Sequence, residues 1–589
     1  GGGNAGPIAI AAGPIGAGGN GVDVNVGCQD VDITARGPIN AGGTGIVARS
    51  QCGVRVTTLP GAPVQGATGG IGIVSGTAAA ITVGDRLSAG NGLALDAKGA
   101  GATILIQPTG TIVGRVDLTD NADQFTNAGR FEAVGDSNFG GGADLFVNTG
   151  TIAVRPAATA PGSVSFAGLE ALNNSGVIDL RNGQVGDRLV VPGSFAGTGA
   201  STLGVDVGVA ATDRLVIGGA ATGSTIVLAT GLTGALLAGT VVVDAGAGTS
   251  ARAFQLAGGT QRVGLTDYAL SYDAGSNDFA IVGTPDQAAV APIALADALR
   301  QSFYRSSDAV ATHLDELSTG RALWMNSYGS VDTRHVGIAA TPFGQVRTYG
   351  LNSRQDWFGV QGGVDLTLSP GVLVGVTGGY TNSRLTLSTD PSRFSIEAVN
   401  AGGYARIAPG PFRLDALGKY EHAWVGFRNA PAGLGARLHP GSYGGRAQAS
   451  LIISGRRVTI EPFASLDYAH VDRTGLILGQ FVESIDTAEG LRGKAGARVN
   501  AVVGDGASRV SLYASGAAVH EFGDRDQLTI SNAGTALALF APVVPTYAQV
   551  RAGIDITQGA RVHGFIEGTA DAASDYYGGG GRVGLAVRF

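Results

Sequence analysis

The 589-residue chain has no run of about 18 or more apolar residues, which excludes a transmembrane helix. Histidine is missing from the whole first half, since His313 is the first of seven. A Ser–His–Asp triad or a histidine-containing zinc site therefore cannot be built from the first half alone. Cysteine occurs only twice, so at most one disulfide can form within the chain. If the chain enters a membrane, it does so as strands.

Proline is also scarce, whereas glycine is abundant. The chain has 21 Pro and 99 Gly, and its hydrophobic fraction is an ordinary 44%. A disordered chain would be less hydrophobic and more highly charged. Glycine together with many Ala, Val, Thr and Asn suits short strands with tight turns, as in solenoids and barrels, and disfavours helix-rich folds. At this length we expect two or more domains.

Charge divides the chain into two halves. Residues 1–283 contain 13 Lys and Arg against 20 Asp and Glu, whereas residues 284–589 contain 26 of each kind. The first half therefore accounts for the whole formal net charge of −7. An acidic first half disfavours nucleic acid and anionic lipid as its partners.

Short β-rich pieces such as 22–26 and 103–106 recur in the first half between Gly, Asn and Asp turns. None is long enough to bury a face alone. Recurrence at about 20–27 residues predicts a parallel β-helix, in which each coil stacks on the one before. The phrases that begin at Asn127, Asn148 and Asn174 repeat a turn-then-strand unit, and we expect positive φ at their Asn or Gly residues.

The two cysteines lie about one coil apart. Cys28 and Cys52 are separated by 24 residues, which places them in register on adjacent rungs of the predicted solenoid. A disulfide between them is geometrically reasonable in an oxidising compartment. The alternative is a pair of small buried residues in a ladder. A metal site is not expected, because no His accompanies them.

From residue 186 the strands become more hydrophobic. Asp187-Arg-Leu-Val-Val and Asp213-Arg-Leu-Val-Ile repeat one strand, and a Gly-Ser-Thr turn begins at Gly223. This segment resembles the C-terminal passenger region of autotransporters, where such strands and Gly-x-Thr turns recur. The resemblance implies a cap that helps the β-helix to fold during secretion. Physics also favours a cap, because the last rung of a solenoid is an open edge.

One helical stretch separates the halves. Between residues 286 and 317, Leu299, Phe303, Val310 and Leu314 recur at helical spacing. Gly320 follows as a stop signal. An amphipathic helix packed on a domain surface is one interpretation. A helix that threads a barrel and joins it to the first half is the other, and the strands that follow favour it.

After residue 320 the hydrophobic period becomes two, which indicates strands. Their even number, and short joints that alternate with longer loops, predict a twelve-stranded antiparallel barrel in an outer membrane, with a soluble sandwich as the alternative. The predicted strands are 322–335, 355–369, 372–385, 394–408, 412–425, 441–454, 456–471, 489–503, 508–522, 546–557, 560–571 and 579–589. Aromatics near strand ends are expected to form membrane girdles: Trp324, Tyr328, Trp357, Phe358, Tyr380, Tyr404, Phe412, Tyr420, Trp424, Tyr468, Tyr513 and Tyr547.

The final strand alternates between apolar and other residues. Val583, Leu585, Val587 and Phe589 fall on one face, and Arg582 falls on the other. In lipid this pattern suits a strand that is apolar outside and polar inside. An alternating strand that ends in Phe resembles the assembly signal of bacterial outer-membrane proteins. That resemblance implies the barrel-assembly machinery as a partner.

Residues 290–589 as a whole resemble the autotransporter translocator, including the aromatic strand that contains Trp324 and the glycine-rich stretches around Trp357 and Tyr380. The resemblance implies an outer-membrane protein that exports its own passenger and displays it at the surface or releases it. Adhesion or surface interaction would be its role. Outer-membrane lipid, periplasmic chaperones and an extracellular ligand would be its further partners.

The fold prediction is therefore an all-β chain in four parts. A right-handed parallel β-helix passenger occupies 1–185, and its cap occupies 186–284. A lumen-spanning α-helix follows at 285–320, and a twelve-stranded transmembrane antiparallel β-barrel at 321–589.

No catalytic, cofactor or metal site is predicted. Ser137, in a Gly-Asp-Ser phrase, lacks a general base because no His occurs before His313, which lies in the expected linker helix. A displayed polysaccharide lyase or hydrolase on the same anchor is the alternative. It would draw on carboxylates such as Asp117, Asp120 and Asp123 with Lys98 or Arg115 as the base. The sequence favours a display protein over an enzyme.

Two further hypotheses concern the helix and the barrel. Some autotransporters cut themselves with an Asn in the linker helix, but residues 287–319 contain none. Asp297, Asp308 or Asp315 would have to support a different, acid-assisted cut. The barrel could also act as a pore, with the first half as a periplasmic or plug domain.

Overall fold

The computed structural model describes residues 6–315, 321–505, 508–523, 525–559 and 561–589. It contains two compact units, which divide between Thr284 and Pro285. We call them unit 1 and unit 2. The division falls where the sequence changes in charge. Among the residues described, no helix is long and apolar enough to cross a membrane.

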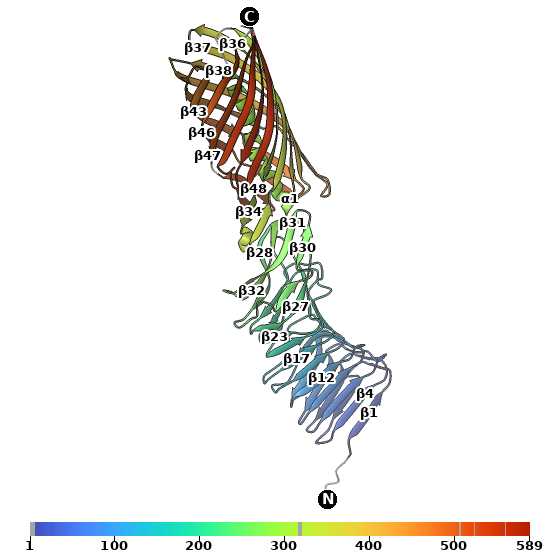
Figure 1. Ribbon diagram of the computed structural model, residues 1–589. Coiled ribbons are helices and arrows are strands. Elements are labelled where there is room, and N and C mark those ends of the chain that lie inside the picture. The colour runs from blue at the N-terminus through green and yellow to red at the C-terminus, as the bar shows by residue number, and fades with distance from the viewer. Residues whose placement is uncertain (1–5, 316–320, 506–507, 524, 560) are drawn as a thin grey trace. The chain divides into compact units, whose positions relative to one another are not determined.

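Unit 1 is a parallel β-solenoid, which confirms the predicted fold class for the first half (Figure 1). Each strand pairs in register with its counterpart one coil later, so that Ile8 lies opposite Val31, and Val31 lies opposite Val54. Further along, Ala79 lies opposite Ala102 in the same way.

The coil strands fall into three sets. The first set contains β1 (Ile8–Ala12), β4 (Val31–Ala35), β7 (Val54–Thr58), β10 (Ala79–Val83), β12 (Ala102–Ile106), β14 (Gln124–Asn127), β17 (Leu145–Asn148), β20 (Ala171–Asn174), β23 (Ser194–Gly197) and β26 (Ala221–Gly223). The second contains β2 (Ile15–Ala17), β5 (Ile39–Ala41), β8 (Val64–Gly66), β11 (Arg86–Gly99), β13 (Thr111–Asp117), β15 (Arg130–Ala133), β18 (Thr151–Val154), β21 (Val177–Asp179), β24 (Thr202–Asp206), β27 (Thr225–Thr230) and β29 (Phe254–Leu256). The third contains β3 (Val22–Asn25), β6 (Thr44–Ser50), β9 (Gly69–Ser75), β16 (Ser137–Asn138), β19 (Ser163–Ala167), β22 (Arg188–Val191) and β25 (Arg214–Ile217).

Alternate side chains of each strand point into the solenoid. Ile33, Val56, Ile81 and Ile104 stack on successive coils of the first set and are at most 1% exposed. The same column continues as Phe125 and Phe146, whose ring centroids lie 4.6 Å apart. Each coil alone is too short to bury this apolar surface, so the coils are stable only as a stack.

Asn127, Asn148 and Asn174 form a buried ladder along the solenoid. Asn127 Nδ2 donates to Asn148 Oδ1 at 2.7 Å, and Asn148 Nδ2 donates to Asn174 Oδ1 at 2.7 Å. Asn174 then donates to the Ser201 hydroxyl at 2.7 Å. The expectation of positive φ in these phrases is wrong, since none of their Asn or Gly residues adopts it. Extended backbone at the strand end aims each amide inward, where it links one coil to the next.

Cys28 and Cys52 are joined by a disulfide, with their Cα atoms 4.7 Å apart. The bridge connects neighbouring coils near the start of the solenoid. Closing a loop of this length restricts the unfolded chain, which stabilises the folded state by about 3 kcal/mol.

The parallel coils continue beyond residue 186 without a break, and antiparallel strand pairing begins only near the end of unit 1. β19 pairs in parallel with β22, which pairs in turn with β25. β28 (Leu237–Ala245) then pairs antiparallel with β32 (Asp278–Pro285), and β30 (Thr260–Val263) pairs with β31 (Thr266–Asp273). The predicted cap segment, 186–284, thus contains ordinary coils followed by an antiparallel end that covers the solenoid edge.

Unit 2 contains a closed antiparallel barrel with twelve strands within the described ranges (Figure 1). Strands that follow one another in the chain pair with each other, and the first strand pairs with the last, with Ala322 opposite Arg588. The predicted number and arrangement are confirmed, and most strand ends fall within a few residues of those expected. The strands are β33 (Ala322–Arg334), β36 (Ser353–Ser369), β37 (Val372–Leu387), β38 (Arg393–Ile407), β39 (Phe412–Asn429), β41 (Gly441–Leu451), β43 (Val458–Val471), β46 (Ala488–Asp505), β47 (Ser508–Glu521), β50 (Tyr547–Gln558), β51 (Val562–Ala572) and β52 (Tyr576–Arg588).

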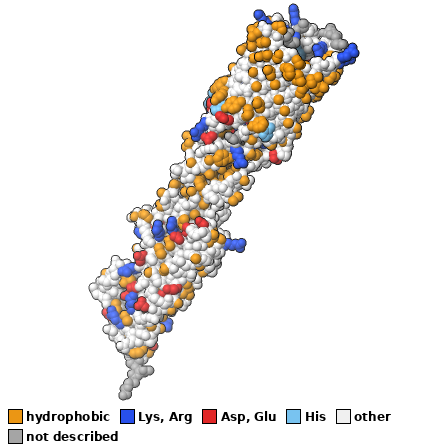
Figure 2. Space-filling model, turned by 90° about the vertical axis from the view of Figure 1, so that its left-hand side faces the viewer, with side chains coloured by type: hydrophobic (Ala, Val, Ile, Leu, Met, Phe, Trp, Pro, Cys, Tyr) orange, Lys and Arg blue, Asp and Glu red, His pale blue; other side chains and the backbone are white. Residues whose placement is uncertain are grey.

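The barrel wall is apolar outside and polar inside. On β52, Val583, Leu585 and Val587 are 52%, 53% and 40% exposed, and Phe589 beyond them is 75% exposed. Arg582 points the other way and is 7% exposed. Figure 2 shows hydrophobic side chains gathered over the outer wall of the barrel. This alternation is the one that a bilayer outside and water or polar groups inside require.

Half of the aromatics assigned to membrane girdles point into the barrel instead. The expectation is wrong for them because they lie on the same alternation phase as the inward polar residues, where Tyr404 donates to Asp365 at 2.6 Å. The buried set is Trp324, Tyr328, Trp357, Tyr404, Tyr513 and Tyr547. The exposed set is Phe358, Phe412, Tyr420, Trp424 and Tyr468, whereas Tyr380 is half-buried.

Unit 2 begins with helices. Asp286 caps α1 (Gln287–Val290) by accepting the Ala289 N–H at 2.9 Å, and the 3₁₀ helix η1 (Ala291–Ile293) follows. The long helix α2 (Ala294–Asp315) comes next. The predicted end of the linker at 316–320, including the Gly320 stop signal, lies outside the described residues.

Shorter strands lie in the longer connections between barrel strands, at one end of the barrel, which we call the long-loop end. They were expected as loops. At the opposite, short-joint end, the strands are linked by tight joints such as the one between Ser369 and Val372. In outer-membrane barrels short joints face the periplasm and long loops face outward. The added elements are β34 (Gly337–Ala340), η2 (Pro342–Gly344), β35 (Arg347–Gly350), β40 (Leu434–Leu438), β44 (Thr474–Leu478), β45 (Phe481–Ile485), β48 (Asp526–Asn532) and β49 (Thr535–Ala541), with β42 (Ile453–Ser454) at the short-joint end.

Candidate functional site: the helix-filled lumen

Helix α2 lies inside the barrel, and its side chains are buried on all sides. Leu299, Phe303, Val310 and Leu314 are 0 to 3% exposed, as the apolar spacing predicts. Arg300, on another side of the helix, is 0% exposed as well. The helix is therefore not an amphipathic helix on a domain surface. Its polar residues are buried too, and the barrel wall supplies their partners.

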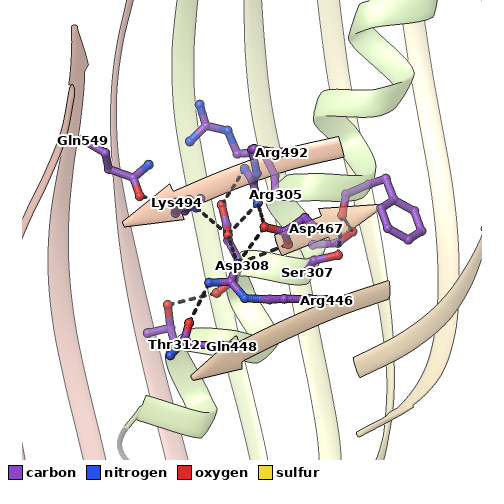
Figure 3. A network of polar contacts seen from close by, with 12 residues as sticks. Arg305, Ser307, Asp308, Thr312, Arg446, Gln448, Asp467, Arg492, Lys494 and Gln549 are labelled. Carbon is purple, nitrogen blue, oxygen red and sulfur yellow. Dashed lines mark hydrogen bonds and ion pairs between the residues drawn. The ribbon is translucent and has the colours of Figure 1, made fainter. Parts of the chain in front are cut away.

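Asp308 is the centre of a buried charge cluster (Figure 3). Its carboxylate accepts from Arg446 Nη1 at 2.8 Å, from Arg492 Nη2 at 2.9 Å and from Lys494 Nζ at 2.8 Å. Asp467 lies within 3.3 Å of Arg446 and 3.2 Å of Arg492. Three cations of the wall thus share one carboxylate of the helix and one of the wall. We call these five residues the Asp308 cluster.

Two arginines of α2 reverse this polarity, because their partners are carboxylates. Arg305 donates to both oxygens of Asp332 at 2.7 and 2.8 Å and lies 3.2 Å from Asp571. Arg300 pairs with both oxygens of Asp526, at 2.5 and 3.1 Å. Charges of both signs on the helix therefore meet opposite charges on the barrel wall and on β48, at different depths. Such an arrangement fixes the rotation and depth of the helix.

Near the short-joint end, His313 stacks on Trp324 with ring centroids 4.1 Å apart. His313 Nε2 lies 3.0 Å from Asp365 Oδ2, and the Tyr404 hydroxyl donates to Asp365 at 2.6 Å. Trp324 Nε1 donates to the Tyr404 hydroxyl at 2.7 Å. These inward-facing aromatics thus hold His313 of the helix, Trp324 by stacking on it and Tyr404 through Asp365.

The middle of the helix presents hydroxyl groups to Glu421 of β39. Ser302 donates to one carboxylate oxygen at 2.8 Å and Ser306 to the other at 3.0 Å. Lys419 lies 3.4 Å from Glu421, and its ammonium group lies 3.9 Å from the Phe303 ring centroid. A cation over an aromatic face is itself favourable in a water-poor site.

At the long-loop end, the β34–β35 hairpin holds the start of the helical segment. The Gln287 amide donates to the Gly350 carbonyl at 2.7 Å and accepts the Gly350 N–H at 3.0 Å. The Tyr349 hydroxyl donates to the Pro285 carbonyl at 3.1 Å. The chain is thereby fixed where it enters the barrel.

The lumen around α2 has little free volume. A cavity lined by residues such as Asp297, Gln301 and Asp332 measures about 30 Å³, and another beside Asp315 and Arg498 measures about 20 Å³. Spaces of this size accommodate water molecules and no second stretch of polypeptide. The helix therefore plugs the barrel. A second stretch of polypeptide can pass through the lumen only when the helix is not in it.

The sequence predicts the helix and its apolar stripe but not the Asp308 cluster. A signal was present, because Arg446 on β41 and Arg492 and Lys494 on β46 interrupt strands whose outer face must meet lipid. Charges within such strands have to face the lumen. Asp308, considered above as an acid for backbone cleavage, is instead bound by three cations. Asp315 lies 3.8 Å from Arg498.

The residues considered for a lyase have structural contacts in the coils of unit 1. Lys98 Nζ lies 2.9 Å from Asp117. Asp123 accepts the Ala102 N–H at 2.6 Å. Ser137 is buried, and its hydroxyl accepts a backbone N–H at 3.1 Å. These contacts link neighbouring coils.

Comparisons with known proteins identify the barrel. The family model described as Autotransporter beta-domain matches residues 342–569. Among solved structures, the translocator domain of the autotransporter NalP from Neisseria meningitidis is 18% identical, with a TM-score of 0.40, and covers 51% of this chain and 98% of that one. The transport unit of the autotransporter AIDA-I from Escherichia coli is 13% identical, with a TM-score of 0.39 and coverages of 48% and 99%. The beta domain of the Bordetella autotransporter BrkA is 14% identical, with a TM-score of 0.37 and coverages of 46% and 100%. No curated protein sequence matches the chain.

The match at 342–569 covers strands β36 to β50 and most of β51. The barrel of unit 2 thus matches an autotransporter β-domain, which places unit 2 in the outer membrane.

Proposed function

We propose that the barrel exports unit 1 across the outer membrane and that unit 1 is displayed at the cell surface for adhesion or another surface interaction. The observation that supports this is the path of the chain. Strand β32 ends at Pro285, α1 begins at Gln287, and α2 then occupies the lumen. A passenger that leaves through the long-loop end draws the chain behind it into the barrel. The helix is then the last exported segment and closes the route.

Export also needs partners on both sides of the membrane. The apolar outer wall requires outer-membrane lipid, and the exposed apolar face of β52 fits recognition by the barrel-assembly machinery. An unfolded unit 1 would expose its strand edges in the periplasm, so periplasmic chaperones are expected to hold it. At the surface an extracellular ligand would bind the coils.

The test is protease treatment of intact cells that express the full chain. We expect digestion of unit 1 and survival of a fragment that begins near α1 and contains the barrel. Cells with a permeabilised outer membrane serve as the control for total digestion. Protection of unit 1 in intact cells, with digestion only after permeabilisation, would overturn the proposal.

A further inference from the structure

Four arginines form an exposed cluster on the outside of unit 2, at the long-loop end. Arg384 of β37, Arg393 of β38, Arg428 of β39 and Arg437 of β40 line a groove of about 740 Å³. We call these four residues the Arg cluster. It lies outside the lumen and has no part in holding α2.

The strand register brings the four side chains over one patch of sheet. Arg393 lies directly opposite Arg428. In the neighbouring row, Ser395 and Gly426 lie side by side between Arg384 and Arg437. The floor of the groove is therefore made of small residues, and long basic side chains surround it.

The cluster has no internal counter-ion. Within the part of the chain that the structure describes, none of the four guanidinium groups forms an ion pair or side-chain hydrogen bond. Like charges directly opposite on neighbouring strands destabilise a sheet, and Arg393 and Arg428 are such a pair. Four unpaired cations around one groove therefore favour an anion that comes from outside the chain.

The depth of the Arg cluster relative to the bilayer follows from the positions of the exposed aromatics on β39. Phe412 and Trp424 are 57% and 44% exposed on the lipid-facing phase of this strand. They are separated by about 40 Å along the strand, or about 30 Å across the bilayer after strand tilt, which matches a hydrocarbon core between two interfaces. Arg428 lies about 13 Å further along the same strand than Trp424. The cluster is thus at the depth of the outer-leaflet head groups.

We propose that the Arg cluster binds the phosphate groups of a phosphorylated glycolipid in the outer leaflet. Guanidinium groups match phosphate oxygens with paired, charge-assisted hydrogen bonds, and several around one groove suit a head group with more than one phosphate. The bound lipid neutralises the repulsion between Arg393 and Arg428 and fixes this side of the barrel in the membrane. The proposal requires the long-loop end to face outward and does not depend on export of unit 1.

The test measures binding of a bisphosphorylated glycolipid to the purified full chain in detergent. One variant carries R384Q, R393Q, R428Q and R437Q. A matched control removes the same charge from the short-joint end, with R456Q, R457Q, R509Q and R561Q. We expect at least about tenfold weaker binding for the first variant, equivalent to about 1.4 kcal/mol, and wild-type binding for the control. Equal affinity of the first variant and wild type, or an equal loss in both variants, would overturn the proposal.

Two further ligands identify the source of the phosphate. The dephosphorylated glycolipid should bind wild type at least about tenfold more weakly, equivalent to about 1.4 kcal/mol. Equal affinity would show that acyl chains and sugars suffice. Inorganic pyrophosphate should compete only at far higher concentration. If it binds as tightly as the glycolipid, the site takes a free phosphate and the lipid assignment is wrong.

A single substitution distinguishes ligand binding from a structural role. Arg393→Gln removes one member of the like-charged pair, so thermal unfolding in lipid-free detergent should occur at the same temperature as in wild type or higher. With the bisphosphorylated glycolipid present, wild type should gain more thermal stability than the variant. A variant that unfolds earlier without lipid, or gains as much with it, would contradict the proposal.

Discussion

Replacing Asp308 with Ala should loosen the helix plug, because it leaves three buried cations with one carboxylate. Removing one partner of a buried ion pair costs about 3–5 kcal/mol. Asp467 remains close to Arg446 and Arg492, so we expect the lower end of this range, about 3 kcal/mol. Lys494 would lose its ion-pair partner.

The assay is thermal or denaturant unfolding of the purified full chain in detergent, followed by the mobility of folded barrel in a gel. Asp315→Ala is the matched control, since Asp315 is on the same helix but has only weak partners, with Arg498 at 3.8 Å and Gln448 Nε2 at 3.3 Å. That change should cost no more than about 1 kcal/mol. Replacing Lys494 with Met in the Asp308→Ala background should restore part of the loss, which a double-mutant cycle measures. Equal unfolding midpoints for Asp308→Ala and wild type would refute the reasoning.

Three other predictions concern assembly, export and pH. Phe589→Ser should reduce the yield of heat-modifiable folded barrel in cells, because it removes an exposed aromatic from the lipid-facing phase that resembles the assembly signal; unchanged yield would contradict it. Changing Leu215 and Ile217 to Asp places two charges in the buried core of the coils, so unit 1 should fail to reach the surface while the barrel still folds; normal protease accessibility on intact cells would count against this. Burial and the nearby Asp123 and Glu170 carboxylates raise the pKa of Asp144 to about 6. Because this pKa is above that of the unfolded chain, unit 1 should lose about 1 to 2 kcal/mol of stability as pH rises through about 4 to 6. Asp144→Asn should flatten that dependence, and an unchanged pH profile of denaturant unfolding would exclude Asp144 as its source.

The barrel was predictable because its environment acts on every strand in the same way. Lipid outside and polar groups inside impose a period of two, and Val583, Leu585 and Val587 follow it in ten residues of sequence. The solenoid was predictable for a related reason, since each coil has to bury its apolar side chains against the neighbouring coils. The Asn127 phrase shows the limit of this reasoning. Its spacing identified the repeat, but the role of its amide depends on the coil above it.

The lumen was much less predictable, because its contacts join residues that are far apart in the chain. Asp308 and Arg446 are separated by 138 positions, and only barrel closure brings them together. Trp324 and Trp424 illustrate the same point. Both were expected in a membrane girdle, but Trp324 stacks on His313 inside the barrel, whereas Trp424 faces outward. Composition and local alternation do not distinguish them.

The central claim is that this barrel exports the unit to which it is joined. The most direct test produces the two units as separate chains, divided between Thr284 and Pro285, in the same cells. The account predicts that the barrel still folds in the outer membrane but that unit 1 stays inaccessible to protease added outside, whereas unit 1 of the intact chain is digested. Equal surface digestion of unit 1 in the divided and the intact protein would contradict the account.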